Sequence, residues 1–226
     1  MYKQLLIFLF IIISCNIYGQ DYLIGVFTGY KNSNIVSDIF ENSNSRKSIE
    51  IGLSLERNHN KTLHSEIGLH YSKKGFVTDE QLTDLTGQLL EDLAKTHFNY
   101  NYLSLPIKVG YNYGNRISGF INIGVSPSLL LNSKLKIEAI EGIMEEVSVS
   151  TTESVSKFDI GGIVELGGKY QLSKSLFIFS SVELDSSFIS ITNEDYFKEE
   201  SIKHYGINLR LGLKYALLNK TGSNMR

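Results

Sequence analysis

Segments of about ten residues in which apolar and polar side chains alternate recur along this chain, and they constrain its fold more than any other feature. The plainest segment covers residues 207–215, where Ile207, Leu209, Leu211, Leu213 and Tyr215 alternate with polar, charged or glycine residues. Alternation with a period of two is typical of a β-strand whose two faces meet different surroundings. The pattern recurs too often for a single half-exposed sheet.

About eight such segments can be marked, each near the length that a tilted membrane-spanning strand requires. They cover residues 21–30, 48–57, 62–73, 98–112, 117–131, 157–170, 175–188 and 202–215. Short turns follow the second, fourth and sixth segments, whereas the longer links are residues 31–47, 74–97, 132–156 and 190–201. Short turns at one rim and long loops at the other are typical of outer-membrane barrels. The sequence therefore predicts an all-β, antiparallel, up-and-down transmembrane β-barrel of about eight strands.

The second long link breaks the β pattern. Between residues 78 and 95, Leu82, Leu85, Leu89 and Leu93 fall at helical spacing. Thr78 and Gln81 form a candidate capping box. These residues predict a short amphipathic helix in the second extracellular loop, which either covers the barrel rim or binds a partner or a membrane surface.

The N-terminal residues have the pattern of an export signal. Lys3 is followed by an apolar core, Leu5–Ile13, which is too short to span a membrane, and then by small or polar residues. We expect a cleaved signal peptide at 1–20, a barrel domain at 21–217 and a C-terminal tail at 218–226. The single cysteine, Cys15, is removed with the signal, or else it belongs to a lipoprotein box and is lipidated.

Composition excludes several classes of protein. A net charge of −2 and a pI near 6.2 give no reason to expect nucleic-acid binding. After the signal, no apolar run reaches the roughly 18 residues that a membrane helix needs. The 13 Tyr and 12 Phe suit a strand-rich chain, and Tyr can replace the missing Trp at the membrane interfaces.

The polar faces of the predicted strands carry many charges. If the apolar faces contact lipid, these charges point into a narrow lumen, where they are tolerated only when paired or hydrated. We therefore expect a structural charge network inside the barrel. Its predicted members are Glu50, Glu66, Lys108, Asp159, Glu165, Lys169, Glu183, Asp185, Arg210 and Lys214. A narrow solute pore or proton path is the alternative for the same residues.

Alternation alone does not say which face is inside. A soluble, lipocalin-like barrel would turn its apolar faces inward around a ligand and its charges outward. We favour apolar faces toward lipid because glycines accompany the charged faces, as a narrow lumen requires.

The sequence offers little for catalysis or metal binding. His64, Glu66 and His70 share one strand face, but residues two apart on a strand lie about 6–7 Å apart, so neighbouring strands would have to supply ligands. Ser187 and His204 fall near the outer rim without a nucleophile-elbow motif. We predict no catalytic residues, no cofactor and no metal.

Four short motifs resemble a known family. Tyr102–Lys108 is similar to the "Y-L-x-I-P-L-x-x-K" strand of PorT-like outer-membrane β-barrel proteins of the Bacteroidetes, and Phe120–Pro127 resembles the strand that follows it. Phe158–Gly162 and the glycine-punctuated strand Tyr205–Tyr215 are similar as well. Two departures are Ser126, which separates Gly-Val from Pro127, and the residues that follow the last strand.

The resemblance implies a function as well as a fold. It implies a porin-family outer-membrane protein of a Gram-negative bacterium, although most members have no established activity and one namesake assists a secretion system. We expect a non-enzymatic protein that acts through its outer loops in surface interaction, envelope integrity or assistance to secretion. The expected partners are outer-membrane lipid and envelope or secretion-system proteins, and a monomer is favoured.

Overall fold

The computed structural model describes residues 22–38, 40, 42–83, 89–140, 144–192 and 201–217. The predicted signal peptide with Cys15 and the tail at 218–226 lie outside these residues. The described strands are β1 (Tyr22–Ser37), β2 (Ser43–Asn58), β3 (Leu63–Thr83), β4 (Leu89–Ser104), β5 (Ile107–Gly114), β6 (Ile117–Ile137), β7 (Val147–Ser150), β8 (Phe158–Gln171), β9 (Leu176–Ser187) and β10 (Ile202–Leu217). No helix in this part of the chain is long and apolar enough to cross a membrane.

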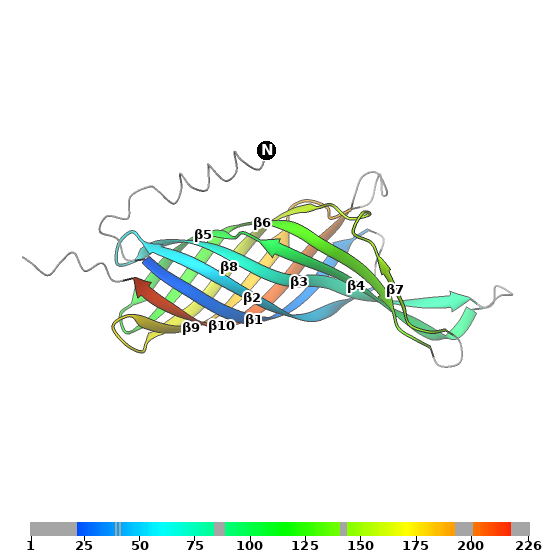
Figure 1. Ribbon diagram of the computed structural model, residues 1–226, viewed down its shortest axis with the longest axis horizontal. Helices are drawn as coiled ribbons and strands as arrows, with labels where there is room; N and C mark the ends of the chain where they lie inside the picture. Colours follow the sequence, from blue (N-terminus) through cyan, green and yellow to red (C-terminus); the bar gives the residue numbers. More distant parts are fainter. Residues whose placement is uncertain are drawn as a thin grey trace, which may run out of the picture.

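The strands close into an antiparallel barrel (Figure 1). Strand β1 pairs with β2 on one side and with β10 on the other, so the first and last strands complete the ring. Strands β4 and β5 both pair with β3 and β6 and are two halves of one barrel strand, while β7 pairs with β6 outside the ring. The described residues therefore form the predicted eight-stranded, up-and-down barrel.

The break between β4 and β5 lies at Leu105 and Pro106. Proline has no N–H to donate to a strand ladder, so pairing is interrupted at this position. The other proline, Pro127, lies on the neighbouring strand β6, where its carbonyl accepts a hydrogen bond of 2.8 Å from the Leu105 N–H. The Pro106 carbonyl accepts one of 2.9 Å from Gly68. The two prolines thus lie at the break between β4 and β5, where their carbonyls still accept hydrogen bonds from neighbouring strands.

At the long-loop end the strands run further than the sequence pattern predicted. The predicted loops at 31–47 and 74–97 are largely strand, because β1 continues to Ser37 and β3 to Thr83. The predicted helix is wrong for the described residues: Leu82 lies in β3, Leu89 and Leu93 lie in β4, and Leu85 is outside the described part. Cross-strand pairing from Thr78–Thr96 to Thr83–Leu89 replaces helical hydrogen bonding.

In the middle of the barrel wall the apolar side chains face outward, and the charged ones face inward. Val164, Leu209 and Ile51 are each about half exposed, at 49%, 55% and 54%. This excludes the lipocalin-like alternative, in which the faces would be reversed.

Exposed aromatic residues border the apolar band at both ends, as in membrane barrels. They are Tyr30, Phe158, Phe188 and Tyr205 at the long-loop end, and Tyr111, Tyr113, Tyr170 and Tyr215 at the short-turn end.

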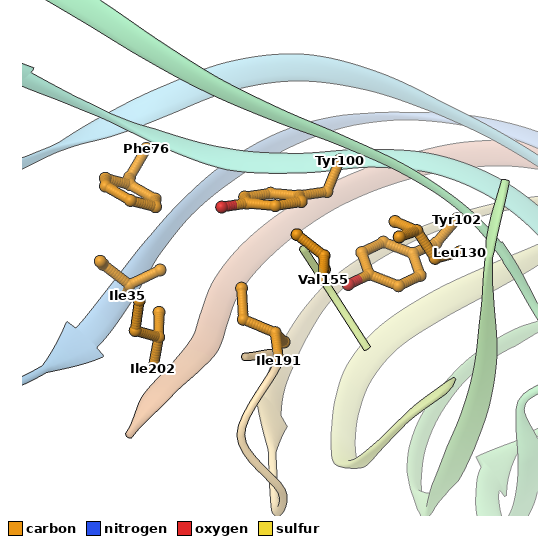
Figure 2. Packing of buried hydrophobic residues seen from close by; sticks show 8 residues of the cluster. All are labelled: Ile35, Phe76, Tyr100, Tyr102, Leu130, Val155, Ile191 and Ile202. Carbon is orange, nitrogen blue, oxygen red and sulfur yellow. The ribbon is translucent and has the colours of Figure 1, made fainter. Parts of the chain in front are cut away.

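An apolar cluster fills the lumen at the long-loop end (Figure 2). Phe76 of β3 and Tyr102 of β4 are fully buried in it, and the Phe76 ring stacks on Phe98 with centroids 4.3 Å apart. Two residues outside the strands, Val155 and Ile191, complete the cluster from the connecting loops. The Ile191 N–H donates a hydrogen bond of 2.8 Å to the Ile202 carbonyl, which fixes the loop over the opening.

Candidate functional site

The polar interior below the apolar cluster begins with two lysines and two aspartates. Lys31 Nζ lies 2.7 Å from Asp185 Oδ1, and Lys74 Nζ lies 3.0 Å from Asp159 Oδ2. Ser187 Oγ donates a hydrogen bond of 2.9 Å to the same Asp159 oxygen. Each charge is therefore buried with an opposite charge beside it.

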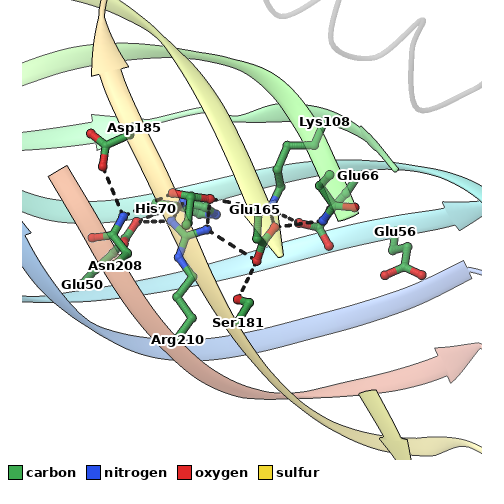
Figure 3. A network of polar contacts seen from close by, with 12 residues as sticks. Glu50, Glu56, Glu66, His70, Lys108, Glu165, Ser181, Asp185, Asn208 and Arg210 are labelled. Atoms are coloured by element: carbon green, nitrogen blue, oxygen red, sulfur yellow. Dashed lines mark hydrogen bonds and ion pairs between the residues drawn. The ribbon is translucent and has the colours of Figure 1, made fainter. Parts of the chain in front are cut away.

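Arg210 forms the centre of the network (Figure 3). Its Nη2 lies 2.8 Å from Glu50 Oε1, and its Nη1 pairs with Glu183 Oε2. His70 Nδ1 lies 3.1 Å from the same Glu50 oxygen. Asn208 donates hydrogen bonds to Glu183 and Asp185, at 3.2 and 3.3 Å, and so connects this centre to the outer ion pairs.

Three lysines continue the network toward the short-turn end. Lys108 Nζ bridges Glu66 and Glu165 at 2.6 and 2.7 Å. Lys214 Nζ bridges Glu56 and Glu66, at 2.5 Å from each. Lys169 Nζ lies 2.8 Å from Glu56 Oε1. Charged side chains thus follow one another from the apolar cluster to the short-turn end of the lumen.

The middle of the barrel is filled by these side chains. The cavity beside Arg210, Glu50 and Lys74 has a volume of only 20 Å³, which is enough for about one water molecule. At the short-turn end the lumen opens into a hollow of 340 Å³ whose lining includes Lys61, Lys169 and Lys174. A solute that entered this hollow would meet the packed network.

All ten residues predicted for the interior network lie in the lumen and take part in the ion pairs above. Lys31 and Lys74 belong to the same network, although the sequence pattern predicted loops at these two positions. Glu56 and His70 lie on inward faces of the predicted strands and join the network too. The signal for Lys31 is the alternation that continues past Tyr30, with Lys31 and Ser33 buried and Asn32 exposed. The same alternation extends the strand to Ser37 and places Lys31 on its inward face.

His64, Glu66 and His70 are not brought together as a metal site. His64 Nδ1 contacts the Asn112 amide at 2.9 Å, whereas His70 contacts Glu50 on the neighbouring strand. Within the described ranges, no group of three or more His, Cys, Asp or Glu side chains could hold a metal ion. Ser187 is bonded to Asp159, and neither ring nitrogen of the buried His204 has a hydrogen-bond partner.

Above the apolar band, β3, β4, β6 and β7 continue as a sheet that extends beyond the rest of the barrel (Figure 1). At its surface His97 Nε2 donates a hydrogen bond of 2.6 Å to Glu138 Oε1. This bond, with the charge of nearby basic groups, holds the pKa of the Glu138 carboxyl below its usual value of 4.5. Lys136 and Glu146 form a second exposed ion pair at 2.7 Å.

Comparison with solved structures identifies similar barrels. A major outer membrane protein from Thermus thermophilus is 13% identical with a TM-score of 0.50, and the match covers 87% of this chain and 99% of that one. OprG from Pseudomonas aeruginosa is 14% identical with a TM-score of 0.46, covering 89% and 97%. Neisserial surface protein A is 11% identical with a TM-score of 0.48, covering 86% and 96%.

No curated protein matches the sequence. The likeness to the Thermus protein supports the barrel fold, and the assignment to a family rests on the sequence match. Residues 18–196, which are most of the chain, match the outer membrane protein beta-barrel domain family. The chain belongs to the outer membrane protein beta-barrel domain family and is an outer-membrane β-barrel protein.

Proposed function

We propose that this protein is a non-enzymatic, PorT-like outer-membrane barrel, exported by a cleaved signal peptide, that acts through the sheet above its long-loop rim. In this proposal the rim faces the cell exterior and the short turns face the periplasm. The protein contributes to surface interaction, envelope integrity or secretion through contacts with envelope or secretion-system proteins, and the barrel itself serves as a monomeric anchor in lipid.

The main support for this proposal is that side chains fill the lumen. A cavity of 20 Å³ at the level of Arg210 is too small for a solute path, and the Phe76–Tyr102 cluster lies above it. A barrel filled in this way offers its outer surface and rim for contact with partners, rather than its interior.

The sheet above the rim supplies such a surface. Its strand β7 is exposed along its whole length, with Val147 and Val149 at 40% and 51%, and Leu93 of β4 is 53% exposed. Apolar side chains in water beyond the apolar band are positions where a protein partner gains contact area. Because these residues lie on paired strands, their positions are held by the barrel.

Four measurements test this proposal. We expect the protein to fractionate with the outer membrane and to migrate faster on a denaturing gel when unboiled. In planar bilayers it should give no steady conductance, and a protease added to whole cells should cleave within the β3–β4 or β6–β8 connections. Solubility in periplasmic extracts without a mobility shift, or a stable solute conductance, would refute the proposal.

A further inference from the structure

The outward face of the barrel changes from apolar to basic just beyond the apolar band at the long-loop end. On β2 the outward residue after Ile49 is Lys47, and on β3 the one after Tyr71 is Lys73. Strand β10 carries Lys203 on the outer side of Tyr205, and β6 carries Lys134 beyond Leu131. We call these four residues, Lys47, Lys73, Lys134 and Lys203, the outer lysine belt.

Strand register places an asparagine directly opposite three of these lysines. Lys47 pairs with Asn32 of β1, Lys73 with Asn101 of β4, and Lys134 with Asn99 of β4. The same combination of an ammonium group and an amide on adjacent strands thus recurs around the wall. An ammonium group donates to phosphate oxygens, and an amide can both donate to and accept from a sugar hydroxyl.

The belt lysines differ from the lysines of the lumen in that no described carboxylate forms an ion pair with them. Each lumen lysine forms an ion pair, as Lys31 does with Asp185. Within the described part of the chain, no ion pair involves any belt lysine, and Lys47, Lys73 and Lys134 are exposed. The carboxylates of Glu138 and Glu146, on the sheet above, are already paired with His97 and Lys136.

We propose that the outer lysine belt binds the phosphorylated sugar headgroups of the glycolipid that forms the outer leaflet. The proposal rests on the orientation given under the proposed function, which places the belt at the headgroup level of that leaflet, just outside Tyr71 and Tyr205. Lysine side chains at this depth extend their ammonium groups toward the interface. The unpaired ammonium groups neutralise the negative charge of the phosphates. Asn99 and Asn101 already donate from Nδ2, to the His97 carbonyl and to Asn132 Oδ1, so it is their amide oxygens that accept from sugar hydroxyls.

Lys47 and Lys73 are the sharpest pair for a test because their strands are adjacent, with Ser48 Oγ donating a hydrogen bond of 2.6 Å to the Lys73 carbonyl. The variant K47Q/K73Q removes two charges from the belt. The matched control, K61Q/K174Q, removes two exposed lysines from the hollow at the short-turn end.

The probes are bis-phosphorylated lipid A, the same lipid after enzymatic dephosphorylation, and phosphatidylglycerol. Binding to the folded protein in neutral detergent is followed by native mass spectrometry.

We expect bis-phosphorylated lipid A to bind more tightly than the other two lipids. Each belt lysine removed should weaken binding about fivefold, because one basic side chain at an anionic lipid surface contributes on that scale. The control variant should bind as the wild type does. Equal binding of the dephosphorylated lipid or of phosphatidylglycerol, or an equal loss in the control, would overturn the proposal.

Unboiled gel mobility of every variant checks that the barrel is folded. A folded, membrane-inserted barrel that shows no preference for phosphorylated lipid A refutes the belt proposal and leaves the proposed function intact. Failure of the wild type to insert into the outer membrane refutes the proposed function instead. The two failures are therefore distinguishable.

Discussion

Arg210 and Glu50 form an ion pair of 2.8 Å although a whole strand, β1, lies between the strands that carry them. Both residues are paired in register with Gly29, which has no side chain in the lumen. The guanidinium and the carboxylate therefore meet over the glycine. The network depends on this gap as much as on its charges.

Replacing Gly29 with leucine should break this ion pair. A Cβ at this position would lie 3.1 Å from Arg210 Cγ and 3.2 Å from the Leu209 carbonyl oxygen, so a larger side chain must displace Arg210. We expect a loss of about 3 kcal/mol in the free energy of unfolding, since a buried charge loses its partner. Urea titration with gel mobility as the readout measures it. The control V26L, on the lipid face, should change stability by less than about 0.5 kcal/mol.

Removing Lys108 should leave two carboxylates without their shared partner. We expect K108M to cost about 3–5 kcal/mol, because Glu66 and Glu165 both lose a buried cation. The double variant K108M/E165Q should recover part of this loss, and V109M on the lipid face is the control. Equal stability of the single and double variants would show that the loss in K108M does not come from an unpaired Glu165 carboxylate.

A charge in the middle of the apolar band should be costly, and one at the short-turn rim should not. Val164 lies halfway along β8 and faces outward, so V164R should lose about 2–4 kcal/mol in lipid bilayers. L172R, in the turn after β8, should lose about 0–1 kcal/mol. The two values come from the same folding titration in vesicles. Similar costs at both sites would contradict the assignment of this face to lipid.

The apolar cluster at the long-loop end should contribute stability without being the only seal. Phe76 is fully buried, so F76A should cost about 3–5 kcal/mol. Conductance in planar bilayers should remain at the wild-type level, since the charge network still fills the lumen below. A stable conductance increase in F76A would mean that the cluster alone closes the barrel.

Glu138 should titrate below its usual pKa of 4.5 because His97 donates a hydrogen bond to its carboxylate. A lowered folded-state pKa gives a stabilisation that is present above pH 4.5 and is lost as the pH falls through the folded value. Carboxyl ¹³C NMR of the folded protein measures the midpoint. In H97Q the midpoint should return toward 4.5, whereas an unchanged midpoint would exclude His97 as the cause.

The alternation of side chains was enough to predict the barrel, its strand number and its inward charges. Period-two alternation shows which residues share a face of a strand. In a barrel, one face of each strand contacts lipid and the other lines the lumen. Ile207, Leu209 and Leu211 are outward for this reason, and Asn208 and Arg210 are inward. These assignments need only local sequence.

The prediction from local sequence was wrong in residues 78–95, where a helical spacing of leucines competes with strand alternation. Leu82, Leu89 and Leu93 are spaced as on a helix, yet β3 and β4 pair through this region because each strand continues a ladder that begins in the membrane. Cross-strand hydrogen bonds between β3 and β4 decided the outcome, and the spacing of side chains within one segment does not contain them.

The sequence by itself determined which residues of a predicted strand share a face, because alternation is a local property of each strand, and the glycines on the charged faces indicated that these faces line the lumen. Only the tertiary structure decided which of them meet. Arg210 and Glu50 are 160 positions apart, and their contact follows from the closure of β1 onto β10 and the register at Gly29. Register and closure are properties of the whole ring, so a single strand cannot specify them.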